Sequence, residues 1–315
     1  MADNSAMTVN SIPAFQPLTG IYEPSAIRQL PDGRFLVVED EKQHPFSLVT
    51  LHPDGRVSSV PLSTQVQGDS GGFRKPDDLE GMALDRMGNI YAITSHSRDG
   101  DGDQKKSRNK LVRFRIVTDR ITEPLVTKEL KPALLAAHPT LAAAAKIRDG
   151  KDNEGFNIEA LEISPGQQHL LIGFRSPLLD NQTIIASVEN HTAIFEAGAA
   201  PQISSMLITL DLDGHGIRGL CHAPALNGYL IISGPASSEP VQFQLWFWSG
   251  QACEPARRVS VPGLPDFEHA EGVCPAVIDG QPRIVIVIVS DGGSRKAERY
   301  AQFLLLDPAQ LQIEP

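Results

Sequence analysis

Five positions in the chain share a local pattern and could gather polar side chains around one point. Each stands at the start of a short apolar segment, which a turn containing Gly, Asn or Asp joins to a second apolar segment. We call them the ring positions, and they are Ser25, Glu80, Glu159, Arg218 and Glu271. Three carboxylates held within a few ångströms repel one another unless a proton or a cation compensates them. The pattern therefore predicts a charge-balanced cluster.

Three interpretations of the ring positions follow from their residue types. Arg218 supplies one positive charge against three carboxylates, so a divalent cation would balance the remainder, and oxygen-only ligands favour Ca²⁺ or Mg²⁺. In that interpretation the metal ligands are Ser25, Glu80, Glu159 and Glu271. Alternatively, Arg218 ties the glutamates into a buried salt network without a metal, or the charges are solvated separately.

A second polar set lies where the second apolar segment of each repeat ends. His96 could act there as a general acid or base, or it could only satisfy a loop hydrogen bond. Arg175 suits an oxyanion, because guanidinium binds such groups bidentately, although a salt bridge between repeats is an equal alternative. With Arg218, these are the predicted catalytic residues. The predicted substrate-binding residues are Glu41, Arg98, Ser290 and Asp291.

The elements that position these residues form repeats of about 50 residues, each with room for four short strands. The repeats lie near 21–66, 77–130, 157–212, 216–262 and 269–315. Radial repetition of four-stranded units is typical of β-propellers. The sequence therefore predicts an all-β, single-domain, five-bladed β-propeller, in which residues 8–18 pair into the last blade and close the ring. A six-bladed propeller is the alternative.

The topology of a propeller predicts which face is functional. The first strand of each blade lines the central channel and begins on one rim, called here the upper rim. The long connections are expected on this rim, and they are residues 95–109, 131–156, part of 176–204, and 262–269. Function concentrates in long loops on a rigid scaffold. A short helical insertion is expected near 131–148, with a break before Pro139, serving as a lid or as a structural plug.

Composition narrows the class of protein. The hydrophobic content is 41%, the charged content is 21% and the formal net charge is −10, so a general affinity for nucleic acid or anionic membrane is not expected. No apolar run is long enough to span a membrane, and the N-terminus lacks a signal-peptide pattern. We therefore expect a cytoplasmic protein, although a processed exported chain would look the same. Three cysteines favour reduced thiols. The oligomeric state is left open.

Several stretches resemble known propellers. The chain is similar to a bacterial family of unknown function, the phytase-like esterase propellers, in Tyr22-Glu23-Pro24-Ser25, Val38-Glu39-Asp40-Glu41-Lys42, Asp78-Leu79-Glu80-Gly81, Ser95-His96-Ser97, Gly173-Phe174-Arg175-Ser176-Pro177-Leu178 and Gly216-Ile217-Arg218-Gly219-Leu220. The ring positions also resemble those of the calcium-activated nucleotidases (apyrases), whose order is Ser, Glu, Glu, Ser, Glu. Four positions agree and Arg218 departs. The second resemblance implies Ca²⁺ in the channel.

These observations lead to one functional expectation and two alternatives. The leading expectation is a divalent-metal-assisted hydrolase of phosphoester type, acting on a small anionic substrate at the upper mouth of the channel, where arginines would hold the charge. The first alternative is a non-catalytic propeller that binds a small anionic ligand or a partner protein on the same rim. The second is a lactonase-like esterase.

Overall fold

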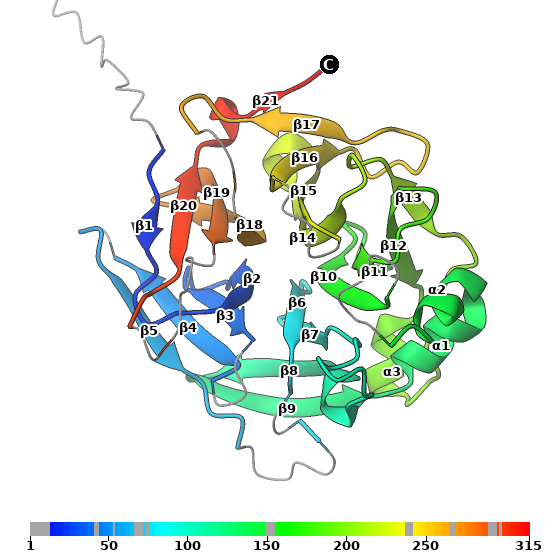
Figure 1. Cartoon of the computed structure of the whole chain (residues 1–315). Coiled ribbons are helices and arrows are strands. Elements are labelled where there is room, and N and C mark those ends of the chain that lie inside the picture. Colours follow the sequence, from blue (N-terminus) through cyan, green and yellow to red (C-terminus); the bar gives the residue numbers. More distant parts are fainter. Residues whose placement is uncertain are drawn as a thin grey trace, which may run out of the picture.

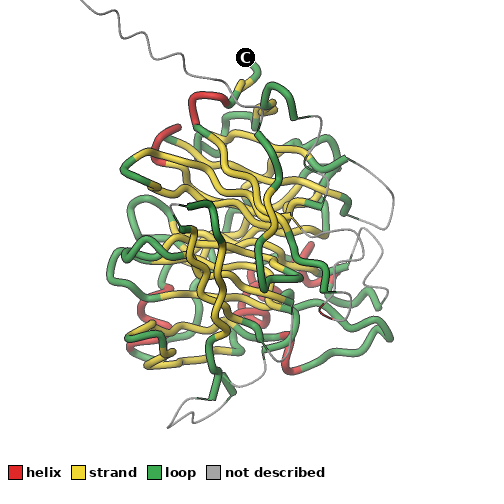
Figure 2. The backbone as a smooth tube through the Cα atoms, turned by 90° about the vertical axis from the view of Figure 1, so that its left-hand side faces the viewer, coloured by secondary structure: helices red, strands yellow, loops and turns green. Residues whose placement is uncertain are grey.

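The computed structural model confirms the predicted five-bladed β-propeller. It describes residues 13–40, 44–52, 54–65, 72–73, 76–148, 155–236, 242–264, 267, 269–288, 295 and 298–315. Five antiparallel sheets lie around a central channel, and in each sheet the strand that carries a ring position is innermost (Figure 1). In the side view, the strands occupy the middle of the molecule and loops lie around them (Figure 2).

Each blade is built on four strands in the predicted order, and the fourth blade gains a fifth strand at its outer edge. The first blade comprises β2 (Pro24–Gln29), β3 (Phe35–Glu39), β4 (Phe46–Leu51) and β5 (Val57–Pro61). The second comprises β6 (Leu79–Leu84), β7 (Ile90–Thr94), β8 (Leu111–Val117) and β9 (Arg120–Thr127). The third comprises β10 (Asn157–Ile163), β11 (Leu170–Ser176), β12 (Thr183–Val188) and β13 (Ile208–Leu210). The fourth comprises β14 (Gly216–Ala223), β15 (Gly228–Gly234), β16 (Gln244–Trp248) and β17 (Arg257–Ser260).

The fifth blade is completed by the N-terminal segment. Its strands are β18 (Ala270–Ile278), β19 (Gln281–Ile288), β20 (Gln302–Leu306) and β1 (Gln16–Pro17). β1 pairs with β20, and the backbone N–H of Leu18 donates to Ala301 at 2.8 Å. The first blade thus follows directly on a strand of the last, which joins the two ends of the ring. Of the segment expected to close the ring, residues 8–12 lie outside the described residues.

The C-terminal strand lies in a different blade from the one expected. The sequence predicts that the fifth repeat extends to residue 315, but β21 (Gln312–Ile313) pairs with β17 at the outer edge of the fourth blade. The 3₁₀ turn η4 (Pro308–Gln310), capped by the Asp307 side chain, separates β20 from β21. Because β1 already occupies the outer position of the fifth blade, the chain end satisfies an open edge on its neighbour instead.

Short helices lie in the connections between strands. The expected insertion forms α1 (Leu130–Ala137) and α2 (Pro139–Ala144), with the break at His138, before the proline, as predicted. Residues 176–204 contain two connections, one before β12 and one after it. The expectation places part of this range on the upper rim, but the longer connection, which follows β12, lies on the lower rim. This connection contains α3 (His191–Glu196). Within the described residues, no helix is long and apolar enough to cross a membrane.

Apolar side chains between neighbouring blades form the core. Phe46 of the first blade and Phe114 of the second, for example, meet edge to face with ring centroids 4.9 Å apart. The two residues are fully buried. Close packing of this kind resists small displacements of the strands. The blades therefore provide a stiff frame for side chains at the channel mouth.

Candidate functional site

A β-bulge presents every ring position to the channel. In β6, Leu79 pairs with Thr94 and Gly81 with Ile93, which leaves Glu80 as an extra residue without a partner on β7. The same one-residue shift occurs in β2, β10, β14 and β18 at the other ring positions, Ser25, Glu159, Arg218 and Glu271. A bulge re-aims a side chain out of the regular alternation of a strand. Five equivalent bulges therefore turn five polar side chains toward one axis.

Small residues follow the ring positions because the innermost strands approach one another closely. A Cβ atom on Gly81 would lie 2.7 Å from the backbone nitrogen of Leu161 in the next blade. One on Gly219 would lie 2.7 Å from the carbonyl oxygen of Glu271. No side chain fits at these distances. The polar-then-glycine pair is therefore a signature of the channel wall, and alanine replaces the glycine in the first and third blades.

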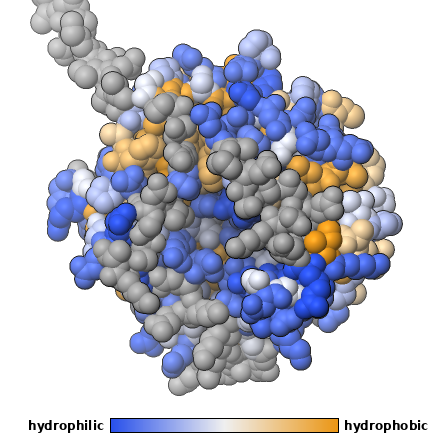
Figure 3. All heavy atoms as spheres, in the orientation of Figure 1, coloured by the Kyte–Doolittle hydropathy of each residue, from blue (hydrophilic) through white to orange (hydrophobic). Residues whose placement is uncertain are grey.

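The ring positions surround one pocket at the upper mouth of the channel. Its volume is about 740 Å³, and all five ring residues line it. Figure 3 shows hydrophilic surface around the centre of this face. Among the described residues, seven carboxylates and four guanidinium groups line the pocket. The wall thus carries an excess of negative charge, and this excess is distributed unevenly.

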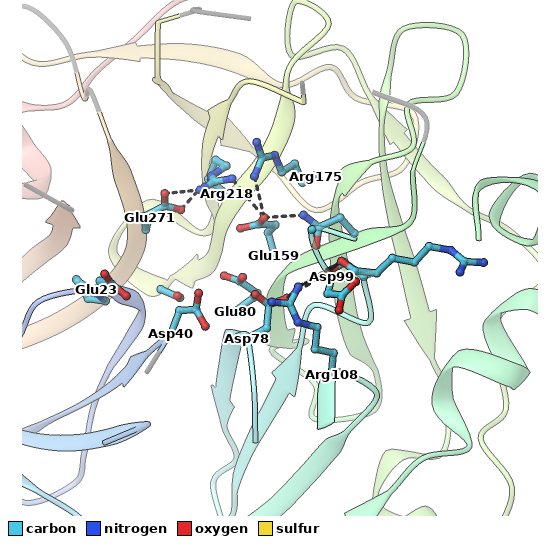
Figure 4. A pocket seen from close by; sticks show the side chains of 16 residues that line it. Glu23, Asp40, Asp78, Glu80, Asp99, Arg108, Glu159, Arg175, Arg218 and Glu271 are labelled. Atoms are coloured by element: carbon cyan, nitrogen blue, oxygen red, sulfur yellow. Dashed lines mark hydrogen bonds and ion pairs between the residues drawn. The ribbon is translucent and has the colours of Figure 1, made fainter. Parts of the chain in front are cut away.

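One side of the pocket is an arginine-paired half, which consists of Glu159, Glu271, Arg175 and Arg218 (Figure 4). The Arg218 guanidinium binds Glu271 bidentately, with Nε 2.9 Å from Oε2, and its Nη1 donates to Oε1 of Glu159 at 3.2 Å. Arg175 Nη1 donates to the same Glu159 oxygen at 3.4 Å. Burial lowers the pKa of Arg218, but Glu159 and Glu271 raise it above its usual range. Two cations thus neutralise two carboxylates.

The other side is an acidic half, which consists of Glu23, Asp40, Asp78 and Glu80 (Figure 4). Within the described residues, the Glu80 carboxylate makes no hydrogen bond or ion pair. Burial, with repulsion from Glu159 and Asp78, raises the pKa of Glu80 well above its usual value. Loss of hydration, with the charges of Asp78 and Glu23, raises the pKa of Asp40 to about 7.

Asp78 differs from Glu80 because it faces a cation at short range. Its Oδ2 lies 3.1 Å from Nη1 of Arg108, and it accepts hydrogen bonds from the hydroxyls of Ser95 and Ser97. Arg108 also reaches Asp77, with Nε 3.7 Å from Oδ2. One guanidinium is therefore shared between two aspartates, and it does not compensate Glu80.

The donor chemistry of the acidic half fits a hard divalent cation. Every candidate ligand is an oxygen, from a carboxylate or from the hydroxyl of Ser25, which favours Ca²⁺ or Mg²⁺. Nearby, the Oδ1 atom of Asn157 is buried, and no described residue forms a hydrogen bond with it. In the described part of the chain, however, no three Asp, Glu, His or Cys side chains are already gathered closely enough to hold a metal ion. Binding would therefore require carboxylate side chains to turn inward.

Several predicted site residues are engaged elsewhere. His96 does not line the pocket and is fully buried; its Nδ1 donates to the carbonyl of Thr94 at 2.7 Å. Burial lowers the pKa of His96 to about 4, so the ring is neutral near pH 7 and does not suit the acid–base role expected of it. Arg98 lines the pocket, but its guanidinium donates to the carbonyls of Gly102 and Ala145. Glu41, Ser290 and Asp291 lie outside the described residues.

Reasoning from the sequence missed a second layer of pocket residues. Glu23, Asp78 and Asn157 each stand two positions before a ring position, and all three line the pocket. This shared spacing before the ring positions could have revealed them. Arg108 was missed as well, since it lies in the long connection between β7 and β8 and no local pattern marks it.

Solved structures with a similar fold are propellers of varied activity. A GH43 beta-1,3-galactosidase solved with galactodeoxynojirimycin has a TM-score of 0.50 and 11% identity over 93% of each chain. A putative oxidoreductase (glucose dehydrogenase) from Thermus thermophilus has a TM-score of 0.47 and 15% identity over 93% of this chain and 100% of that one. At 11% identity, the likeness to the galactosidase shows the fold alone.

The sequence comparisons place the chain without assigning a reaction. The search among curated proteins found no match. A family model described as "Protein of unknown function (DUF3616)" matches residues 123–304, which span more than half of the chain and include ring positions of the third, fourth and fifth blades. The protein therefore belongs to the DUF3616 family.

Proposed function

We propose that the acidic half binds a divalent cation, Ca²⁺ or alternatively Mg²⁺, and that the pocket hydrolyses a small anionic ester of phosphoester type. The observation behind this proposal is the Glu80 carboxylate, which is held at the channel mouth among other carboxylates without a partner in the described residues. A buried charge in that state is costly unless it is protonated or meets a cation.

The charge of the pocket favours this function over simple anion binding. Seven carboxylates would repel an anion from the wall as it stands, because the four guanidinium groups are engaged with carboxylates or carbonyls. A bound divalent cation would offset two of the four negative charges of the acidic half. When bound, it would supply Lewis-acid stabilisation of a substrate oxygen. The resemblance to the phytase-like esterase propellers stays a hypothesis beside the family match.

The chain's own residues would divide the remaining tasks. Glu80, Asp78 and Asp40 would hold the cation. Arg175 lies at the pocket wall with its Nη1 and Nε engaged, and its Nη2, which bonds to none of the described residues, would be available to an anionic oxygen. Arg218 would keep Glu159 and Glu271 fixed and ionised. A substrate anion would thus lie between the cation and Arg175.

Metal content and thermal stability test this function most directly. Ca²⁺ at 100 times its Kd should stabilise the protein by about 2.7 kcal/mol, and EDTA should remove that increment. Hydrolysis of a generic phosphoester should require the cation. Glu80→Gln should abolish both effects, whereas Glu189→Gln, which alters an exposed carboxylate outside the pocket, should leave both unchanged. The proposal is refuted if the purified protein contains no metal and its melting temperature does not change on addition of Ca²⁺ or Mg²⁺.

A further inference from the structure

The floor of the pocket is closed by the side chain of Arg28. This residue of β2 is 8% exposed and lies in the channel, three positions after Ser25. Its Nη1 donates to the carbonyl of Val273 at 2.8 Å, and its Nη2 donates to that of Leu220 at 3.0 Å and to Glu162 Oε2 at 2.8 Å. A single guanidinium therefore ties the first blade to the third, fourth and fifth across the channel axis.

Little space remains between Arg28 and the ring positions. The cavity there has a volume of about 10 Å³ and is lined by Arg28 and by the innermost strands, including Ser25 and Glu80. A space of this size holds about one water molecule. No substrate can pass it, so the pocket is blind. A ligand must enter and leave through the upper mouth.

The walls of the pocket offer almost no apolar contact. Its lining consists of charged and small polar residues, and the exceptions are Pro24 and Gly100. No aromatic side chain lines it, and the residues outside the described part of the chain include no Phe, Tyr, Trp or His. Ligand pockets are usually lined by hydrophobic and aromatic side chains. This pocket has no surface on which a nucleobase or an aryl group could stack.

We infer that the pocket takes up a compact, fully hydrophilic ligand, such as the phosphate of a small polyol, and discriminates against aromatic and nucleoside phosphates. The phosphate part rests on the proposed function. The exclusion of aromatic groups rests on the walls and the floor alone. A ligand with hydroxyl groups would pair with the carboxylates and with Asn157, whose buried oxygen has no partner in the described residues.

Three monophosphates that differ only in the attached group test this inference by calorimetry in the presence of Ca²⁺. They are glycerol 2-phosphate, phenyl phosphate and adenosine 5′-monophosphate. Glycerol 2-phosphate should bind, and the two aromatic compounds should bind more weakly, because their rings find no apolar surface and displace hydroxyl contacts. Burial of an aromatic ring in an apolar site would instead strengthen binding by more than about tenfold. Binding of either aromatic compound that is as tight as that of glycerol 2-phosphate or tighter, or no binding of any probe, overturns the inference.

Two further results locate the ligand and separate the hypotheses. Arg175→Met should weaken glycerol 2-phosphate binding at least about tenfold, because a charge-assisted contact is lost. Arg120→Met, which alters an exposed arginine outside the pocket, should leave binding unchanged. Unchanged binding in Arg175→Met would place the ligand elsewhere and overturn the inference. Glycerol 2-phosphate that binds as expected but is not hydrolysed would refute the proposed hydrolase while leaving the ligand class intact.

Discussion

The two halves of the pocket present glutamates from equivalent bulges in opposite electrostatic states. Glu271 is bound bidentately by Arg218, and Glu159 accepts from both Arg218 and Arg175. Glu80 occupies the same position in its own blade, yet it has no partner in the described residues. The difference arises because only one ring position is an arginine, and its side chain reaches the third and fifth blades. Equivalent geometry thus produces a charge-compensated cluster on one side and an uncompensated one on the other.

The largest expected effect comes from removing the cation of the arginine-paired half. Arg218→Met leaves Glu159 and Glu271 buried with only Arg175 nearby, so the free energy of unfolding should fall by about 3 to 5 kcal/mol. Urea denaturation measures this loss. Arg258→Met removes an exposed arginine paired with Asp213 and should cost less than about 1 kcal/mol. Equal losses in the two variants would mean that the pairing of Arg218 has no special weight.

The pH dependence of stability should come mainly from the acidic half. The pKa values of Asp40, Asp78 and Glu80 are raised in the folded state, so the folded protein retains protons that the unfolded chain has released. In EDTA, stability should therefore fall as the pH rises from the acid range toward the raised pKa of Asp40, about 7.

His96 acts in the opposite direction, because its pKa is lowered and its neutral form favours the folded state as the pH rises. The contribution of the acidic half is therefore measured as the difference in stability between the wild type and an Asp40→Asn, Glu80→Gln double variant. Urea denaturation at about pH 5 and about pH 7.5 brackets the expected loss of stability. The variant should lose less stability over this interval. Parallel curves would contradict the raised pKa values.

The same substitution should have opposite signs in the two halves. Glu80→Gln removes an uncompensated buried carboxylate, so it should stabilise the protein in EDTA by about 1 kcal/mol. Glu271→Gln breaks a bidentate ion pair and should destabilise it by about 3 kcal/mol. Thermal or urea unfolding of the two variants in parallel provides the comparison. Destabilisation of both to the same extent would show that Glu80 has a partner as good as that of Glu271.

The smallest expected effect on activity is at His96. This residue has a positive φ of 56°, which Asn tolerates well, so His96→Asn keeps the backbone conformation. Loss of the bond to Thr94 should reduce stability by about 1 kcal/mol. Because the side chain does not line the pocket, kcat/KM for any substrate and its dependence on pH between about 6 and 8 should stay within about twofold. A lost ionisation in that range would restore His96 as an acid or base.

The fold could be predicted because its determinants are local and repeated. Each hairpin has a turn residue with a positive φ, such as Gly33, Gly88 or Asn227, and flanking apolar segments that alternate or run continuously. Because the pattern occurs five times, an error in assigning the strands of one repeat does not change the predicted fold. The pairing of the C-terminal strand with the fourth blade could not be predicted. Either terminal segment could pair with the outer edge of the fourth or of the fifth blade, and the closed ring determines which segment pairs with which edge.

The sequence alone determined the ring positions, since a polar residue followed by Gly or Ala and an apolar segment recurs at each of them, and the propeller axis then brings them together. Only the tertiary structure decided what these side chains do. The decisive contacts join different blades or loops. Arg218 binds Glu159 and Glu271, Arg28 closes the floor of the pocket, and Arg108 is shared between Asp77 and Asp78. Such contacts depend on distances across the channel, which no local spacing encodes. The imbalance of charge between the two halves of the pocket is therefore a property of the closed ring.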